Sequence, residues 1–212
     1  MRKLRMSAFA GIIAFVLYIP LLILTDYIPA PPEYDLFMLI LFFLATASFA
    51  IFIWGFAVIA SKTRNTLLEK TIHVALIFIL TLFLPFILPS DLAYDLNSLI
   101  VNILNTIIFP LSVLLFVLFA FGLLRIRKKI GINATLTTLA AFLSVGGLLI
   151  GWYLTLMDIG YGFYTSEDVY IAFSGSTTAF HIFSVTLTLF CIFGVLTLFK
   201  ASHVFEKQAK RK

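Results

Sequence analysis

The stretch that decides the fold is LFMLILFFLATASFAIFIWGFAVIA, from Leu36 to Ala60, which has no charged residue over 25 positions. A helix needs roughly 20 apolar residues to cross the hydrocarbon core of a bilayer. A strand of a membrane barrel alternates in polarity, whereas this stretch is apolar at both odd and even positions. The stretch therefore predicts a membrane-spanning helix.

The rest of the chain repeats this pattern. Five further stretches lack charged residues: Ser7 to Thr25, Thr71 to Leu88, Leu99 to Leu124, Leu136 to Met157 and Ile171 to Phe199. Of the 212 residues, 62% are hydrophobic and 12% charged, against about 45–50% and 25% in soluble domains. This composition excludes soluble, fibrous, disordered and nucleic-acid-binding proteins. We expect an all-α polytopic membrane protein, with six transmembrane helices in a single domain over residues 1–212.

The charged residues alternate in sign along the connections. All 15 basic residues precede the first stretch, follow the sixth, or lie between the second and third or the fourth and fifth. Eight of the ten acidic residues lie in the other connections. Because basic residues concentrate on the cytoplasmic side of a membrane, we expect a multi-pass protein of the cell membrane with both termini cytoplasmic. The first stretch is retained as a span, since Ala30 before Pro31 and Pro32 makes a poor signal-peptidase site.

Three acidic residues take similar positions after the odd-numbered spans. Asp26, Asp91 and Asp158 are 65 and 67 residues apart, and Gly55, Gly122 and Gly194, near the inner ends of the even spans, are 67 and 72 apart. The spacing suggests three tandem helical hairpins, residues 1–65, 66–132 and 133–203, followed by a basic tail, residues 204–212. Each of these features is also common in unrelated membrane helices, so chance resemblance stays an alternative.

Polar side chains inside the spans mark a candidate site. Asn102 and Asn105 share one face of the fourth span, and Ser174, Thr178 and His181 share one face of the sixth. Both stripes fall in the outer half of the membrane. Two interpretations are open: hydrogen bonds between helices, or a cleft that binds a ligand. An acidic mouth of Asp26, Asp91 and Asp158 would raise the local concentration of cations at such a cleft.

The third span begins with a recognisable capping pattern. Thr66-Leu67-Leu68-Glu69 has the spacing of a capping box, in which the hydroxyl and the carboxylate bond the first amides of a helix. We therefore expect Thr66 to cap this helix.

No sequence pattern indicates catalysis. The chain has no glycine-rich phosphate loop, no nucleophile elbow and no paired acids within a span, so we expect no enzyme. No second histidine matches the depth of His181 for haem, and the single cysteine, Cys191, excludes a Cys-pair metal site, so no cofactor or metal is expected.

The leading hypothesis is a small transport or permeation protein, or a membrane subunit of a larger complex. It would handle a cation or small polar solute through the outward-facing polar cleft. The alternatives are a scaffold or assembly subunit that does not transport, and a quinone-site or electron-transfer membrane subunit. The expected partners are the lipid bilayer, other membrane subunits and the solute, with no nucleic acid.

Overall fold

A computed structural model describes residues 2–27, 35–81, 109–161 and 177–210 of the chain. At the helix ends away from the chain termini, residues 18–27, 151–161 and 177–184 among them, it describes the backbone alone. Within these ranges the chain forms six α-helices and no strand: α1 (Arg2–Tyr27), α2 (Asp35–Thr63), α3 (Thr66–Thr81), α6 (Phe109–Ile130), α7 (Ile132–Tyr161) and α9 (Thr177–Lys210). The expected all-α fold is confirmed for this part of the chain.

Four of these helices are long and apolar enough to cross a membrane. The candidate spans are Ile40–Thr63, Pro110–Ile130, Ile132–Ile150 and Val185–Lys210. Large apolar side chains such as Ile77 and Leu114 are at least half exposed on the outside of the bundle, as side chains that face lipid are. The chain is therefore a multi-pass integral membrane protein, and the expected count of six spans stays a prediction.

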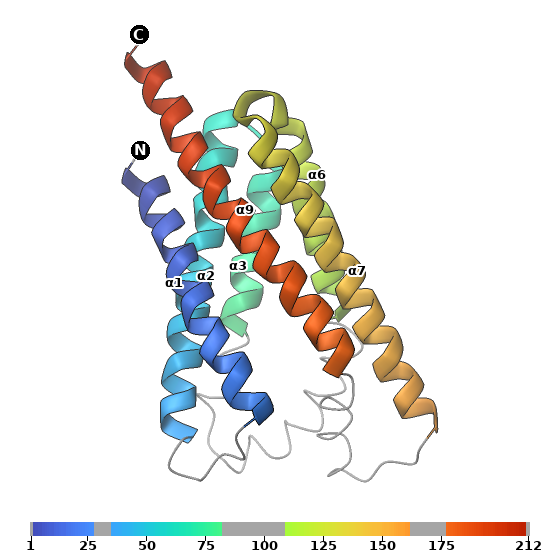
Figure 1. The fold of residues 1–212 in the computed structure, drawn as a ribbon. Helices are drawn as coiled ribbons and strands as arrows, with labels where there is room; N and C mark the ends of the chain where they lie inside the picture. The colour runs from blue at the N-terminus through green and yellow to red at the C-terminus, as the bar shows by residue number, and fades with distance from the viewer. Residues whose placement is uncertain (1, 28–34, 82–108, 162–176, 211–212) are drawn as a thin grey trace.

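The helices close a ring. Each of the six packs against the next one along the chain, and α9 packs against α1. Figure 1 shows that the chain termini, the α2–α3 turn and the α6–α7 turn all lie at one end of the bundle. We call this the basic end, because it carries the lysines and arginines within the described ranges: Arg2, Lys3, Arg5, Lys62, Arg64, Lys70, Arg125, Arg127, Lys128, Lys129, Lys200, Lys207 and Lys210.

The α2–α3 turn corrects the predicted helix cap. Asn65, not Thr66, caps α3: its side-chain Oδ1 accepts a hydrogen bond of 3.2 Å from the amide of Leu68. Thr66 is already the first residue of the helix and is exposed. Asn65 takes the cap position because Arg64 before it has a φ of 55° and turns the chain out of α2. The prediction of Thr66 as the cap is therefore wrong by one residue.

The residues predicted as a basic tail continue α9 without a break to Lys210. Glu206 fixes this extension to α1, because its carboxylate accepts a hydrogen bond of 2.7 Å from the Arg5 guanidinium. The Lys210 ammonium lies 3.9 Å from the same carboxylate, one helical turn further on. The Arg5–Glu206 pair thus joins the N-terminal and C-terminal helices at the basic end.

Inside the ring, four buried phenylalanines pack together: Phe52, Phe56, Phe119 and Phe190. Their ring centroids lie 5.0–6.0 Å apart in edge-to-face pairs, the arrangement that aromatic rings prefer. The Phe52 ring reaches the centre because the facing helices carry glycine there: a Cβ atom on Gly11 or on Gly194 would lie 2.5 Å from a Phe52 ring carbon. We call these four residues the aromatic cluster.

Candidate functional site

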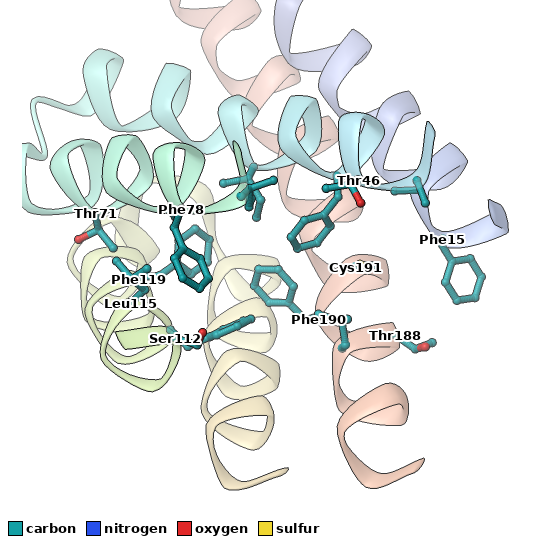
Figure 2. A pocket seen from close by; sticks show the side chains of 18 of the residues that line it. Phe15, Thr46, Thr71, Phe78, Ser112, Leu115, Phe119, Thr188, Phe190 and Cys191 are labelled. Carbon is teal, nitrogen blue, oxygen red and sulfur yellow. The ribbon is translucent and has the colours of Figure 1, made fainter. Parts of the chain in front are cut away.

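A cavity of about 280 Å³ lies inside the ring, between α1, α2, α3, α6 and α9. Each of these helices contributes phenylalanine to its wall, among them Phe15, Phe49, Phe78, Phe119 and Phe190. Figure 2 shows the rings of Phe78, Phe119 and Phe190 projecting toward the same space from three helices. Two members of the aromatic cluster, Phe119 and Phe190, belong to this wall with centroids 5.5 Å apart. The cluster therefore borders the cavity where the lining of α2 and α6 ends toward the basic end.

Small side chains opposite the phenylalanines leave this volume open. Ala14 of α1, Ala45 of α2 and Ala75 of α3 all line the cavity. A well-packed helical core sets large residues against small ones so that facing layers fill the space between them. Here alanines of three helices line the same cavity, and the phenylalanine rings at the other lining positions do not fill the space that they leave.

The cavity wall is apolar in chemistry. None of the described residues that line it is charged, and its polar side chains are limited to hydroxyls and the thiol of Cys191. The Thr71 hydroxyl already donates a hydrogen bond of 2.8 Å to the carbonyl of Leu67 in its own helix. Apolar cavities of this kind exclude water and accept apolar molecules. The wall is thus suited to hydrocarbon and not to an ion.

The size of the cavity allows it to hold a ligand. Its volume of about 280 Å³ exceeds that of apolar cavities that take up small apolar molecules such as benzene. The cavity is therefore large enough for an apolar group.

None of the residues predicted from the sequence as a polar site is among the described residues that line this cavity. Asn102, Asn105, Ser174 and Asp91 fall outside the described residues. Asp26 and Asp158 stand in the last turns of α1 and α7, and Thr178 and His181 in the first turns of α9, with only their backbone described. These four positions share the end of the bundle opposite the basic end (Figure 1). Their grouping into a cleft or an acidic mouth stays a prediction.

Among the described residues, no group of three or more His, Cys, Asp and Glu could hold a metal ion. A buried polar contact instead joins two of the helices. The hydroxyls of Thr137 in α7 and Thr197 in α9 lie 2.8 Å apart and are buried. Thr137 also donates to the carbonyl of Asn133 at 2.9 Å, so its one proton is used and Thr197 is the donor of the pair. Thr137 and Thr197 therefore show that polar side chains of this chain form hydrogen bonds between helices.

Sequence reasoning missed the cavity. Its signal is the recurrence of phenylalanine in α2, where Phe42, Phe49 and Phe56 are seven residues apart and so lie near one face of the helix. In a uniformly apolar span this repeat does not stand out, because its phenylalanine side chains could equally face the interior of the ring or the lipid. Only the placement of facing alanines distinguishes a lined cavity from a filled core.

The described helices establish a multi-pass membrane protein with an apolar interior cavity. Comparison of the chain with protein-family models, with curated proteins and with solved structures finds no match. Its function is therefore inferred from its own geometry and chemistry.

Proposed function

We propose that the protein is a six-span transport or permeation protein, or the membrane subunit of a larger complex, which holds a solute inside its ring of helices. The observation that carries the proposal is the closed ring of helices, in which α9 returns to α1 around an interior. Binding sites of helical bundles commonly lie in such interiors, built from side chains on facing helices.

The proposal places the basic end in the cytoplasm. The segregation of lysine and arginine to that end supports this orientation, since basic residues stay on the cytoplasmic side. The aromatic cluster then closes the interior on its cytoplasmic side, as the hydrophobic constrictions of channels do. Solute would reach the interior from the outer end, where the sequence places Asp26, Asp91 and Asp158.

The solute of this proposal is a cation or a small polar molecule, bound in the outer half. Asn102, Asn105, Ser174, Thr178 and His181 would supply its polar contacts. The apolar wall of the cavity offers a bare cation no charged partner among its described residues, so the cation would rest above the cavity and cross the aromatic cluster only when the cluster opens.

Flux in liposomes tests the proposal. The purified protein is reconstituted, and the uptake of potassium and sodium ions is compared with that of protein-free liposomes. Joint replacement of Asp26, Asp91 and Asp158 by Asn should lower the flux, while Glu69→Gln at the basic end serves as the matched control. Phe119→Ala should raise the flux by widening the constriction. The transport proposal fails if no variant carries either ion above background.

Two further variants distinguish the scaffold alternative from the transport proposal. Asn102→Leu and Asn105→Leu should dissociate a partner from native membranes and leave ion flux unchanged if the polar stripe only docks another helix. Under the transport proposal the two substitutions should lower the flux instead.

The apolar chemistry of the cavity favours a second candidate, the quinone-site subunit. A wall of phenylalanines suits the apolar body and tail of a quinone. Organic extraction of the purified protein, followed by absorption spectroscopy, would identify a bound quinone. Extracts without quinone absorbance would exclude this candidate.

A further inference from the structure

We propose that the cavity binds a hydrocarbon chain of a membrane molecule, either a linear acyl chain or a branched prenyl chain. The inference rests on the described helices and does not depend on ion transport. It concerns the volume of the cavity, the chemistry of its wall and the end from which a chain can enter.

The lining of the cavity extends along two helices. It runs from Phe42 to Ile53 in α2 and from Ser112 to Phe119 in α6, which at 1.5 Å per residue is roughly 16 Å and roughly 10 Å along the helices. A hydrocarbon chain can therefore contact the wall over several carbon atoms.

The volume is large enough for binding. An apolar protein cavity of roughly 150 Å³ already takes up benzene or xenon and stays free of water. The cavity in this ring has nearly twice that volume. It therefore has room for part of a hydrocarbon chain.

The wall holds a chain by apolar contact alone. Phe78, Phe119 and Phe190 offer ring faces and edges (Figure 2), while the Thr71 hydroxyl is engaged by the Leu67 carbonyl. With no charged residue in the described wall, a polar headgroup would be costly inside the cavity. The headgroup must therefore stay outside while the chain fills the interior.

The direction of entry follows from the aromatic cluster. Phe56 is fully buried and follows Ile53, the last lining residue of α2 toward the basic end. Its ring lies 5.0 Å from that of Phe119, the last lining residue of α6 in the same direction. A chain therefore enters with its methyl end toward the basic end and its headgroup toward the opposite end of the bundle.

Photolabelling of the full-length protein tests the proposal. The protein, in phosphatidylcholine nanodiscs, is exposed to a fatty acid that carries a diazirine near its methyl end, and the labelled peptides are identified by mass spectrometry. We expect saturable labelling at lining residues of α2, α3, α6 and α9. Labelling that does not saturate, or that falls on outward-facing residues such as Leu114, would overturn the proposal.

A matched pair of variants in α3 sharpens the test. Ala75 lines the cavity, whereas Ile77, two residues on, is 63% exposed on the outside of the bundle. Ala75→Trp should reduce saturable labelling at least tenfold, and Ile77→Trp should leave it unchanged. Ala45→Leu adds less bulk to the same wall, so it provides a milder variant if Ala75→Trp does not fold, with a loss of several-fold expected. Undiminished labelling in folded Ala45→Leu protein would refute the cavity as the site.

Competition distinguishes the two sources of the chain. Excess unlabelled palmitic acid should displace the probe if the cavity selects acyl chains, and excess geranylgeraniol should displace it if the cavity selects branched prenyl chains. Either result supports a hydrocarbon-chain site and names its ligand class. Displacement by neither compound would contradict the proposal.

Discussion

The side-chain amide of Asn65 donates a hydrogen bond of 2.8 Å to the carbonyl oxygen of Gly122, and so joins the start of α3 to α6. The same side chain caps α3 through its oxygen, which accepts from the Leu68 amide. Gly122 permits this approach, since a Cβ atom there would lie 2.8 Å from the Cβ of Leu68. One buried side chain thus satisfies polar groups of two helices at the basic end.

Removal of this side chain should destabilise the bundle. Asn65→Ala leaves the Leu68 amide without its cap and the Gly122 carbonyl without its donor, a loss that we place at about 1–3 kcal/mol. Thermal unfolding followed by circular dichroism in detergent should show a lower melting temperature. Asn133→Ala is the matched control, because its amide makes only a 3.5 Å contact with the Leu196 carbonyl. Equal melting temperatures for the two variants would contradict the assigned role of Asn65.

The capping error shows where sequence reasoning reached its limit. Six charge-free stretches predicted six helices because length and composition alone decide a membrane-spanning segment. The cap was misplaced by one residue because Asn65 and Thr66 are both good capping residues. The choice between them depends on the left-handed φ of Arg64 and on the distant Gly122 carbonyl, neither of which follows from local sequence.

Gly194 should be intolerant of even one added methyl group. Its missing side chain leaves room for the Phe52 ring, and a Cβ atom would lie 2.5 Å from the Phe52 Cζ. Gly194→Ala should therefore destabilise the protein by about 1–3 kcal/mol through overpacking. Gly146→Ala in α7 is the matched control, because a Cβ atom there meets nothing within 4 Å. The control should be neutral or stabilising by up to about 1 kcal/mol, since alanine favours helix over glycine.

A compensating substitution checks that the cause is the Phe52 ring. Phe52→Leu shortens the side chain that Gly194 faces, so the Gly194→Ala and Phe52→Leu double variant should lose less stability than the sum of the single variants. Chemical unfolding of all four proteins gives the coupling energy between the two positions. If the stability losses of the two single variants simply add in the double variant, the Phe52 ring is not the cause of the intolerance at Gly194.

The hydroxyl pair of α7 and α9 should make a small contribution to stability. Thr197→Val removes the hydrogen bond to Thr137, and bonds of this kind between membrane helices are worth about 0.6 kcal/mol on average. Thr138→Val is the control, since the Thr138 hydroxyl bonds only to the Ala134 carbonyl within its own helix. A double-mutant cycle between positions 137 and 197 should give a coupling near that value. A coupling indistinguishable from zero would mean that the pair only fills space.

The interior cavity is the second feature that could not be predicted from the sequence. Phenylalanine in an apolar span is equally compatible with lipid contact and with a packed core, so Phe78 and Phe190 carried no distinguishing signal. Their role depends on Ala45 and Ala75, which come from two other segments and leave the volume between them open. The polar stripe of Asn102 and Asn105 was easier to notice, because polar residues are rare in spans, but the sequence left its two interpretations open.

The orientation of the bundle can be tested with single cysteines. In a Cys191→Ala background, Lys207→Cys places a thiol at the basic end and Glu33→Cys places one in the connection expected outside. A membrane-impermeant maleimide applied to intact cells should label Glu33→Cys at once, but Lys207→Cys only after permeabilisation, because moving the whole basic end across the membrane opposes the preference of lysine and arginine for the cytoplasmic side. Labelling of Lys207→Cys in intact cells would reverse the orientation, and the aromatic cluster would then close the outer side of the ring.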